Sequence, residues 1–362
     1  YETELHFQLC GLAGAYRHVG RAVSSREVNV AVAERLPQPE GFSEITPAVE
    51  LERELTPRGD ATRGYEDVPI LKPPVWGWEI ACYFFVEGVS AGIYTLGTIA
   101  DLVGVRRYRK TVTYGRLLAL FAMMPAPALL ILDLGRPERF TNMLRVFKPR
   151  SPMNVGTWAL TGYAIFTTLR AAKGLGRALP RIPFFSAILK AIPERTASIA
   201  GLPFALTMLS YPGVLLESTS IPVWSHTPLL GPLIAASSVG SGAAAMSLVG
   251  ECTRDETAIK LVTKMENASV VAEGVCQGAY FATAKSASKP LVRGKYSKLF
   301  WIGGVALGMV VPAILRQRKS KSTRIASSVL TLAGSFALKW AVTHAGKESS
   351  RDRELANRNA EG

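Results

Sequence analysis

The stretch that decides the fold is residues 76–103, which read WGWEIACYFFVEGVSAGIYTLGTIADLV. It is predominantly apolar and longer than the roughly 20 residues that a helix needs to cross a bilayer. Its two tryptophans are typical of the aromatic belt at a membrane surface. The first predicted membrane-spanning range is therefore 77–103. Similar apolar ranges follow at 115–134, 154–172, 197–217, 229–250, 260–282, 298–316 and 325–345. This pattern predicts an all-α integral membrane protein with eight transmembrane helices.

The range 260–282 is the weakest of the eight, because Lys264, Glu266 and Glu273 interrupt it. It can cross a membrane only if these side chains face other helices or a wet cavity, and seven crossings is the alternative. Ser90-Ala91-Gly92 in the first range echoes Ser241-Gly242-Ala243 in the fifth. The echo fits an arrangement as two four-helix bundles.

The composition supports a membrane protein and argues against a nucleic-acid binder. Charged residues are 19% of the chain, below the roughly 25% of typical soluble domains, and hydrophobic residues are 48%. The net charge is +14, but the basic residues lie between the apolar stretches, as in the loops of a polytopic membrane protein. Residues 1–70 differ, with 12 acidic and 7 basic residues.

The sequence therefore divides into three predicted parts. Residues 1–72 form a polar N-terminal tail that contains a possible amphipathic helix and docks on a partner or stays mobile. Residues 73–346 form the membrane domain, and 347–362 a charged C-terminal tail. Lys and Arg number 19 in the loops after odd-numbered helices and 10 after even-numbered ones. The positive-inside rule then places both termini outside the cell.

Cysteine and histidine are too sparse for a metal cofactor in this chain. The four cysteines are scattered and form no CxxC pair, which argues against an iron–sulfur cluster or a zinc site. Bis-histidine haem ligation needs two histidines inside the bundle, and only His226 and His344 are near it. We expect no haem, iron–sulfur cluster or other metal site in this chain.

A charged turn follows the second apolar stretch, LDLGRPERF at residues 132–140. Asp133 ends the apolar run, and Arg136 and Arg139 are close enough to neutralise it. Two interpretations stay open. The turn borders a redox or proton site, where Asp133 transfers protons and the arginines dock a partner, or it is a salt bridge that ends a helix.

Carboxylates inside the first stretch are candidates for proton transfer or for facing a quinol. Glu79, Tyr83 and Glu87 follow one another at helical spacing of four. Intramembrane carboxylates are costly unless protonated, hydrated or paired, so function is the default hypothesis. Glu217 and Glu273 are further candidates of this kind.

A second group of candidates surrounds the end of the fourth stretch. Pro212 interrupts helical hydrogen bonding beside Tyr211, and His226 follows in the next loop. Tyrosine and histidine can hydrogen-bond the two carbonyls of a quinone, although a lone loop histidine is more often simply solvated.

Several motifs resemble the polysulfide reductase membrane-subunit family, the NrfD-like proteins. They are PVWGW at 74–78, YFF at 83–85, residues 132–140, SPM at 151–153, GTW at 156–158, YPGVL at 211–215, PVW at 222–224 and AGKESS at 345–350. The resemblance covers residues 73–352. It implies an eight-helix subunit of the bacterial cytoplasmic membrane without a cofactor of its own.

The resemblance also implies binding of menaquinone or ubiquinone near the outer face and docking of an iron–sulfur protein there. That protein exchanges electrons with a molybdopterin-type or other catalytic subunit, so this chain alone holds no complete active site. The family's quinone-site tyrosine maps to Tyr211, and polar residues near the quinone map to Glu79 and Tyr83. Glu79 stands where some members carry Asn or His, and Pro212 where a small residue is expected.

Two other functions stay open at the level of sequence. One is a proton-translocating or carrier-type protein whose path is formed by Glu87, Glu217, Glu266 and Glu273. The other is a passive anchor that only tethers its partners to the bilayer.

Overall fold

The computed structural model describes residues 71–104, 109–135, 138–175, 192–318, 320–352 and 355. The predicted N-terminal tail, Arg136 and the end of the C-terminal tail lie outside these residues, as does the side chain of Arg139. Every regular element within them is helical. The longer ones are α4 (Trp78–Gly104), α5 (Arg109–Met123), α6 (Pro125–Asp133), α8 (Pro152–Leu175), α10 (Glu194–Glu217), α12 (Leu230–Thr253), α13 (Glu256–Ala284), the π-helical η3 (Leu299–Val310) and α16 (Lys321–Ser349).

Short helices connect or extend these elements. They are α7 (Arg139–Arg145), α11 (Pro222–Ser225), the 3-10 helix η2 (Lys285–Ser288), α14 (Lys289–Arg293) and α15 (Val311–Leu315), which continues η3. Pro125 separates α6 from α5, because proline has no N–H to continue the helical ladder. Pro203 and Pro212 are accommodated inside α10.

Each of the eight predicted ranges is helical, and within the described residues five helical segments are long and apolar enough to cross a membrane. These are Trp78–Val103, Lys110–Asp133, Glu194–Glu217, Leu230–Thr253 and Lys321–Ser349. Leu299–Leu315 is apolar but shorter. The helices α8 and α13 are long enough but more polar. The all-α membrane fold is therefore confirmed, while eight crossings stays a prediction.

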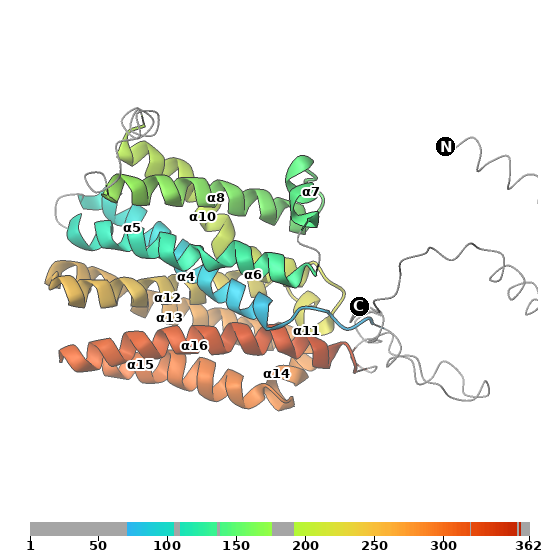
Figure 1. Ribbon diagram of the computed structural model, residues 1–362. Coiled ribbons are helices and arrows are strands. Elements are labelled where there is room, and N and C mark those ends of the chain that lie inside the picture. Colours follow the sequence, from blue (N-terminus) through green and yellow to red (C-terminus); the bar gives the residue numbers. More distant parts are fainter. Residues whose placement is uncertain are drawn as a thin grey trace, which may run out of the picture. The chain divides into compact units, whose positions relative to one another are not determined.

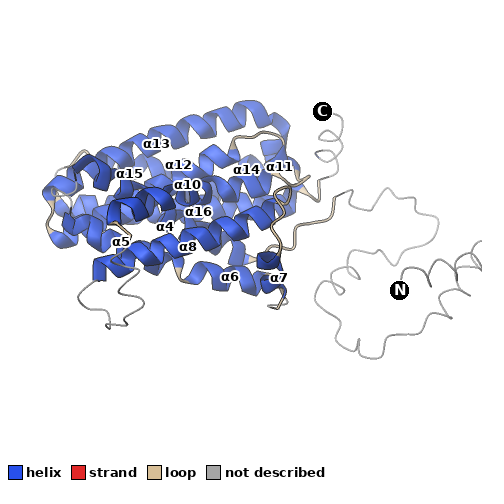
Figure 2. Cartoon of the chain, turned by 90° about the horizontal axis from the view of Figure 1, so that it is seen from above, coloured by secondary structure: helices blue, strands red, loops and turns tan. Residues whose placement is uncertain are grey.

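The long helices run alongside one another (Figure 1 and Figure 2). The apolar window of Trp78–Val103 is 83% buried against 28% for Lys110–Asp133, so α4 is central and α5–α6 peripheral. Glycines bring two helix pairs close together: a Cβ on Gly92 of α4 would lie 3.0 Å from Cα of Gly242 on α12, and one on Gly308 of η3 would lie 2.6 Å from Cα of Gly334 on α16. Because α12 packs against α4 and α10 as well as α13 and α16, the two-bundle arrangement stays a prediction.

Hydrogen bonds and ion pairs define the two ends of the helices. At the Asp133 end, the Gly77 N–H donates to Asp133 Oδ1 (3.3 Å) and the Gly231 N–H to Glu217 Oε1 (2.8 Å). At the opposite end, named here the Arg324 end, Arg324 pairs with Glu251. The starts of α4, α8 and α12 and the ends of α6, α10 and α16 lie at the Asp133 end. Its predicted location is outside the cell.

Candidate functional site

A small cavity lies at the Asp133 end between α4, α6, α8 and α10. Three of the predicted site residues, Tyr83, Tyr211 and Asp133, line it together. The other walls are mostly apolar and include Phe84, Leu215 and the two methionines Met143 and Met153. The volume is about 40 Å³. The structure thus brings residues from three helices to one apolar space with few polar groups.

Tyr211 reaches the cavity because α8 carries a glycine opposite it. A Cβ on Gly156 would overlap the phenol ring and hydroxyl of Tyr211. On the other side of α10, Gly213 packs against the backbone of Leu230 and Gly231 at the start of α12. These close contacts fix where α10 lies and how the Tyr211 side chain is oriented. Tyr211 is 8% exposed.

The segment before α4 contributes to one wall of the cavity. Asp133, half-buried, is held by the Gly77 N–H, and Trp76 lines the cavity above it. The Trp76 ring stacks on Trp224, with 5.5 Å between the ring centroids. Trp224 is fully buried, and its indole N–H donates to the Val342 carbonyl at 2.8 Å. The α11 loop is therefore a structural brace for this end.

Deeper along α4, the cavity's tyrosines approach a buried ionic cluster. Glu87 is 0% exposed, and both Tyr83 and Tyr211 are near enough to interact with its carboxylate. Lys339 of α16, also 0% exposed, interacts with Glu87 and with Glu273 of α13. The cluster therefore joins three helices in the interior of the membrane domain.

Lys339 was missed in the sequence analysis. The available signal was a lysine within the apolar range 325–345, and such a residue needs a buried partner. A second missed cluster lies toward the Arg324 end. There the Asp101 carboxylate accepts hydrogen bonds from Arg116 (2.7 Å) and Arg170 (3.0 Å), and all three side chains are buried.

The other predicted residues lie outside the cavity lining. Glu79 is partly exposed near Asp133, with which it interacts electrostatically. His226 follows α11 and is exposed. Glu217 accepts a hydrogen bond from the Gly231 N–H at the start of α12, which is a helix-capping position. Arg136 and the side chain of Arg139 lie outside the described residues, so their docking role stays a prediction.

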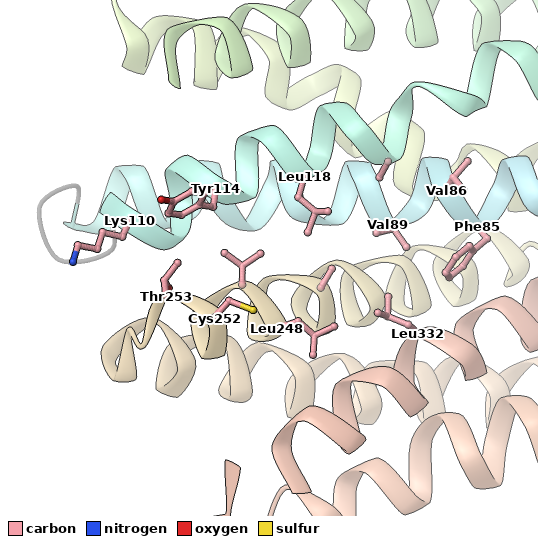
Figure 3. Close-up of a pocket in the computed structure, with 13 residues that line it drawn as sticks. Phe85, Val86, Val89, Lys110, Tyr114, Leu118, Leu248, Cys252, Thr253 and Leu332 are labelled. Atoms are coloured by element: carbon pink, nitrogen blue, oxygen red, sulfur yellow. The ribbon is translucent and has the colours of Figure 1, made fainter. Parts of the chain in front are cut away.

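A larger groove of about 810 Å³ lies elsewhere, between α4, α5, α12 and α16 (Figure 3). Its walls are apolar side chains such as Val89, Leu118 and Leu248, and its polar groups, Lys110 and Thr253 among them, gather toward one end. Its size exceeds that of the Asp133-end cavity, but it lacks a set of polar groups that converge on one point. It is suited to an acyl or isoprenoid tail rather than to a redox headgroup.

Sequence comparison assigns the family. A sequence model described as "Polysulphide reductase, NrfD" matches residues 68–348, most of the chain. The chain belongs to the NrfD family. The family resemblance drawn from the motifs is therefore confirmed, and with it the membrane location of the protein.

Individual relatives of this NrfD-family protein are distant, and the first two described here match over nearly their whole length. Protein NrfD of Escherichia coli (strain K12) is 25% identical over 311 residues, covering 75% of this chain and 95% of that protein. A polysulfide reductase chain of Wolinella succinogenes is 26% identical over 300 residues, covering 75% and 94%. A selenate reductase subunit of Mesobacillus selenatarsenatis is 30% identical over 98 residues, covering 27% and 22%.

Proposed function

We propose that this chain is the quinone-reactive membrane subunit of a multi-subunit oxidoreductase. In this role it exchanges electrons between the quinone pool and a docked iron–sulfur protein. The observation that carries the proposal is the convergence of Tyr83, Tyr211 and Asp133 on one cavity at the Asp133 end. Family membership and relatives named as reductase subunits support the wider role in a complex.

The residues of the cavity fit a quinone headgroup. Phenol hydroxyls such as those of Tyr83 and Tyr211 donate hydrogen bonds to carbonyl oxygens, and apolar walls exclude water from the ring. Because about 40 Å³ holds no more than a water-sized molecule or two, the site must widen on binding. Met143 and Met153 line it, and methionine side chains adapt readily to a new shape.

A bound menaquinone or ubiquinone supplies two-electron, two-proton redox chemistry. In this proposal Tyr83 and Tyr211 orient the headgroup by hydrogen bonds. Asp133 is only half-buried and lies at the end of α6, so its carboxylate can pass protons between the cavity and outer water. Glu79, close to Asp133, offers a second carboxylate on the same path.

The partners follow from the position of the cavity. Electrons need a short path to a neighbouring protein, and the cavity lies directly beneath the surface formed by α7 and the end of α6. An iron–sulfur subunit docks there in this proposal, with Arg136 and Arg139 at the contact, and a molybdopterin-type or cytochrome catalytic subunit follows. The complex lies in the bacterial cytoplasmic membrane with this surface outside.

Photoaffinity labelling tests the binding site. Membranes containing the complex are illuminated with an azido-quinone, and the labelled peptides of this chain are identified by mass spectrometry. The expected labels fall on peptides from α4, α8 and α10 that line the cavity, and excess unlabelled quinone removes them. Labels confined to peptides around Leu118 and Leu248 would instead place the quinone-binding site in the larger groove. Specific labelling absent from the protein would favour a passive anchor.

A further inference from the structure

We infer that the large groove between α4, α5, α12 and α16 binds an anionic phospholipid from the leaflet at the Arg324 end. An acyl chain of this lipid lies in the groove, and its headgroup phosphate lies beside Lys110. The site is separate from the tyrosine cavity and does not depend on quinone binding.

The groove has about the depth of one leaflet. Along α5 its wall is formed by Lys110, Tyr114, Leu118 and Ala122, which recur every four residues on one face of the helix. Twelve residues of α-helix rise about 18 Å, and half of the hydrocarbon core of a bilayer is about 15 Å thick. Because α5 begins at the Arg324 end, the groove extends from the membrane surface there to about the middle of the bilayer.

The polar groups of the groove lie at its surface end. Figure 3 shows Lys110, Tyr114 and Thr253 together at one end of the groove, and Phe85 and Leu332 at the other. The polarity therefore changes along the groove in the same order as along a phospholipid, from a charged headgroup to a hydrocarbon chain.

The apolar part of the groove is preformed. The helices α4 and α12 are in backbone contact, since a Cβ on Gly92 would lie 3.0 Å from Cα of Gly242. Val89 and Ala245, each three residues from that contact, are buried and line the groove. The volume of about 810 Å³ is within the range of small-molecule pockets. A hollow of this size encloses more of an acyl chain than the flat side of a helix can.

A polar recess of about 510 Å³ continues from the surface end of the groove, and Lys110 and Tyr114 line both. The charged side chains in the recess are Lys110, Arg116, Lys173, Asp101 and Glu194. Three basic groups against two acidic ones give the recess a net charge of +1. Because Arg116 pairs with both acidic groups, the excess positive charge lies on the two lysines. This charge complements a headgroup with one net negative charge.

The first turn of α5 favours an anion beside Lys110. Lys110 is the second residue of α5, and this turn contains no acidic residue. The start of a helix carries partial positive charge, so a lysine there is unfavourable unless an anion compensates it. Lys110 is exposed and has no ion-pair partner among the described residues. A bound phosphate compensates both the lysine and the start of the helix.

Tyr114 lies where the groove meets the recess. It is one helical turn deeper than Lys110 and 54% exposed. Tyrosine is enriched at this depth of membrane proteins, and its phenol hydroxyl can donate a hydrogen bond to a phosphate or ester oxygen. Lys110 thus recognises the charge of the lipid, and Tyr114 the region that joins the headgroup to its chains.

The isoprenoid tail of a quinone fits these observations less well. Such a tail explains the apolar walls of the groove but brings no charge to Lys110 or to the recess. In the proposed function the quinone headgroup also lies at the Asp133 end, whereas the polar end of the groove lies at the Arg324 end. The charged end of the groove therefore favours a phospholipid.

Photo-cross-linking tests the site in the intact complex. The complex is placed in phosphatidylcholine nanodiscs that contain a phosphatidylglycerol with a diazirine on one acyl chain, and cross-linked peptides are identified by mass spectrometry. We expect adducts within 110–122 of α5 and 245–253 of α12. Phosphatidylethanolamine with the same acyl chain has no net charge and should give about fivefold fewer adducts, which corresponds to about 1 kcal/mol for one lysine near an anionic headgroup.

Two variants separate charge recognition from chain binding. Lys110→Gln should lower cross-linking of phosphatidylglycerol in the groove about fivefold, whereas Lys260→Gln, at an exposed lysine of α13 outside the groove, should not. Leu248→Trp fills the groove and should abolish cross-linking there by both lipids. Leu206→Trp is its control, because Leu206 is exposed on α10. If Leu248→Trp does not fold, Lys110→Gln at its exposed position still decides the outcome.

Three results would overturn the inference. Equal cross-linking by the two lipids, or wild-type cross-linking in Lys110→Gln, would make the groove an ordinary lipid-facing surface. Absence of cross-linking in the groove would mean that another occupant, such as a helix of a partner subunit, fills it. Loss of the phosphatidylglycerol adducts on addition of excess quinone would assign the groove to quinone. Azido-quinone labelling of the tyrosine cavity is a separate measurement, so the proposed function stands or falls independently.

Discussion

The phenol of Tyr211 packs directly on the backbone of Gly156, in a space that any side chain at position 156 would fill. We therefore expect Gly156→Ala to displace Tyr211 and to destabilise the fold by about 1–3 kcal/mol through overpacking. Azido-quinone labelling of the cavity peptides should fall with it. Thermal unfolding and labelling of the same preparation measure the two effects.

Gly278 provides the matched control for Gly156→Ala. It also lies in a long helix, α13, but an added Cβ there would meet nothing within 4 Å. Gly278→Ala should be neutral or stabilise the helix by up to about 1 kcal/mol. If both variants behaved alike, contact with Gly156 would not determine where Tyr211 lies.

Tyr211→Phe removes a single hydroxyl from the cavity. We expect it to assemble normally but to slow quinol-linked turnover about fivefold, the equivalent of one hydrogen bond of about 1 kcal/mol. Turnover with an artificial dye that bypasses the membrane subunit should be unchanged. Tyr163→Phe is the control, because Tyr163 is buried and bonds Ser90 but does not line the cavity. Equal quinol-linked turnover rates for the wild type and Tyr211→Phe would show that the quinone binds at another site.

Lys339→Met keeps an unbranched apolar side chain that is one atom shorter, but it removes the positive charge that interacts with Glu87 and Glu273. Leaving two buried carboxylates without this partner should cost about 3–5 kcal/mol. Adding Glu273→Gln to Lys339→Met should restore part of that loss. Denaturation of the single and double variants in detergent measures the free energy of unfolding of each. A double variant no more stable than Lys339→Met would argue against an interaction between Lys339 and Glu273.

Asp101→Asn should destabilise the domain without altering the cavity. It removes the carboxylate shared by Arg116 and Arg170. Arg116 keeps its ion pair with Glu194, but the buried Arg170 guanidinium loses its carboxylate partner, at a cost of about 3–5 kcal/mol. The fraction that folds should still be labelled by azido-quinone at α4, α8 and α10. Glu138→Gln, an exposed position, should leave stability unchanged. Wild-type stability for Asp101→Asn would mean that Arg170 does not depend on the Asp101 carboxylate.

The membrane orientation can be checked with single cysteines. Arg150 and Arg318 are exposed at opposite ends of the helices. In a background without the native cysteines, a membrane-impermeant thiol reagent added to intact cells should modify Arg150→Cys and not Arg318→Cys. Reporter fusions within 145–150 and 316–324 provide an independent readout. The reverse pattern would place the quinone site on the cytoplasmic face.

The helices were predictable because a helix that crosses a bilayer needs a long apolar stretch, and such a stretch can be read directly from the sequence. Tyr83 and Glu87 were predictable for a related reason, since helical spacing places them on one face of a single segment. Tyr211 was predicted as a site residue from the family motif that contains it. Its meeting with Tyr83 and Asp133 depends on contacts across helices, and the Gly156 contact that positions it has no signature in α10.

The charged residues show where sequence reasoning ends. Lys339, Asp101 and Arg170 each occur within an apolar range, which marks them as needing a partner but does not identify it. Glu217 was grouped with proton-transfer candidates because a carboxylate near an apolar stretch is unusual. The structure places it at the start of α12, where it bonds a backbone N–H. Helix capping between distant segments cannot be read from a single sequence.

The location of the cavity at the Asp133 end has an energetic consequence for the proposed function. Because electrons and protons would both reach the cavity from that end, turnover would move little net charge across the low-dielectric interior. A membrane voltage is worth about 2.3 kcal/mol for each elementary charge moved across the bilayer per 100 mV. The rate of quinone-linked turnover should therefore change little when an uncoupler collapses the membrane potential.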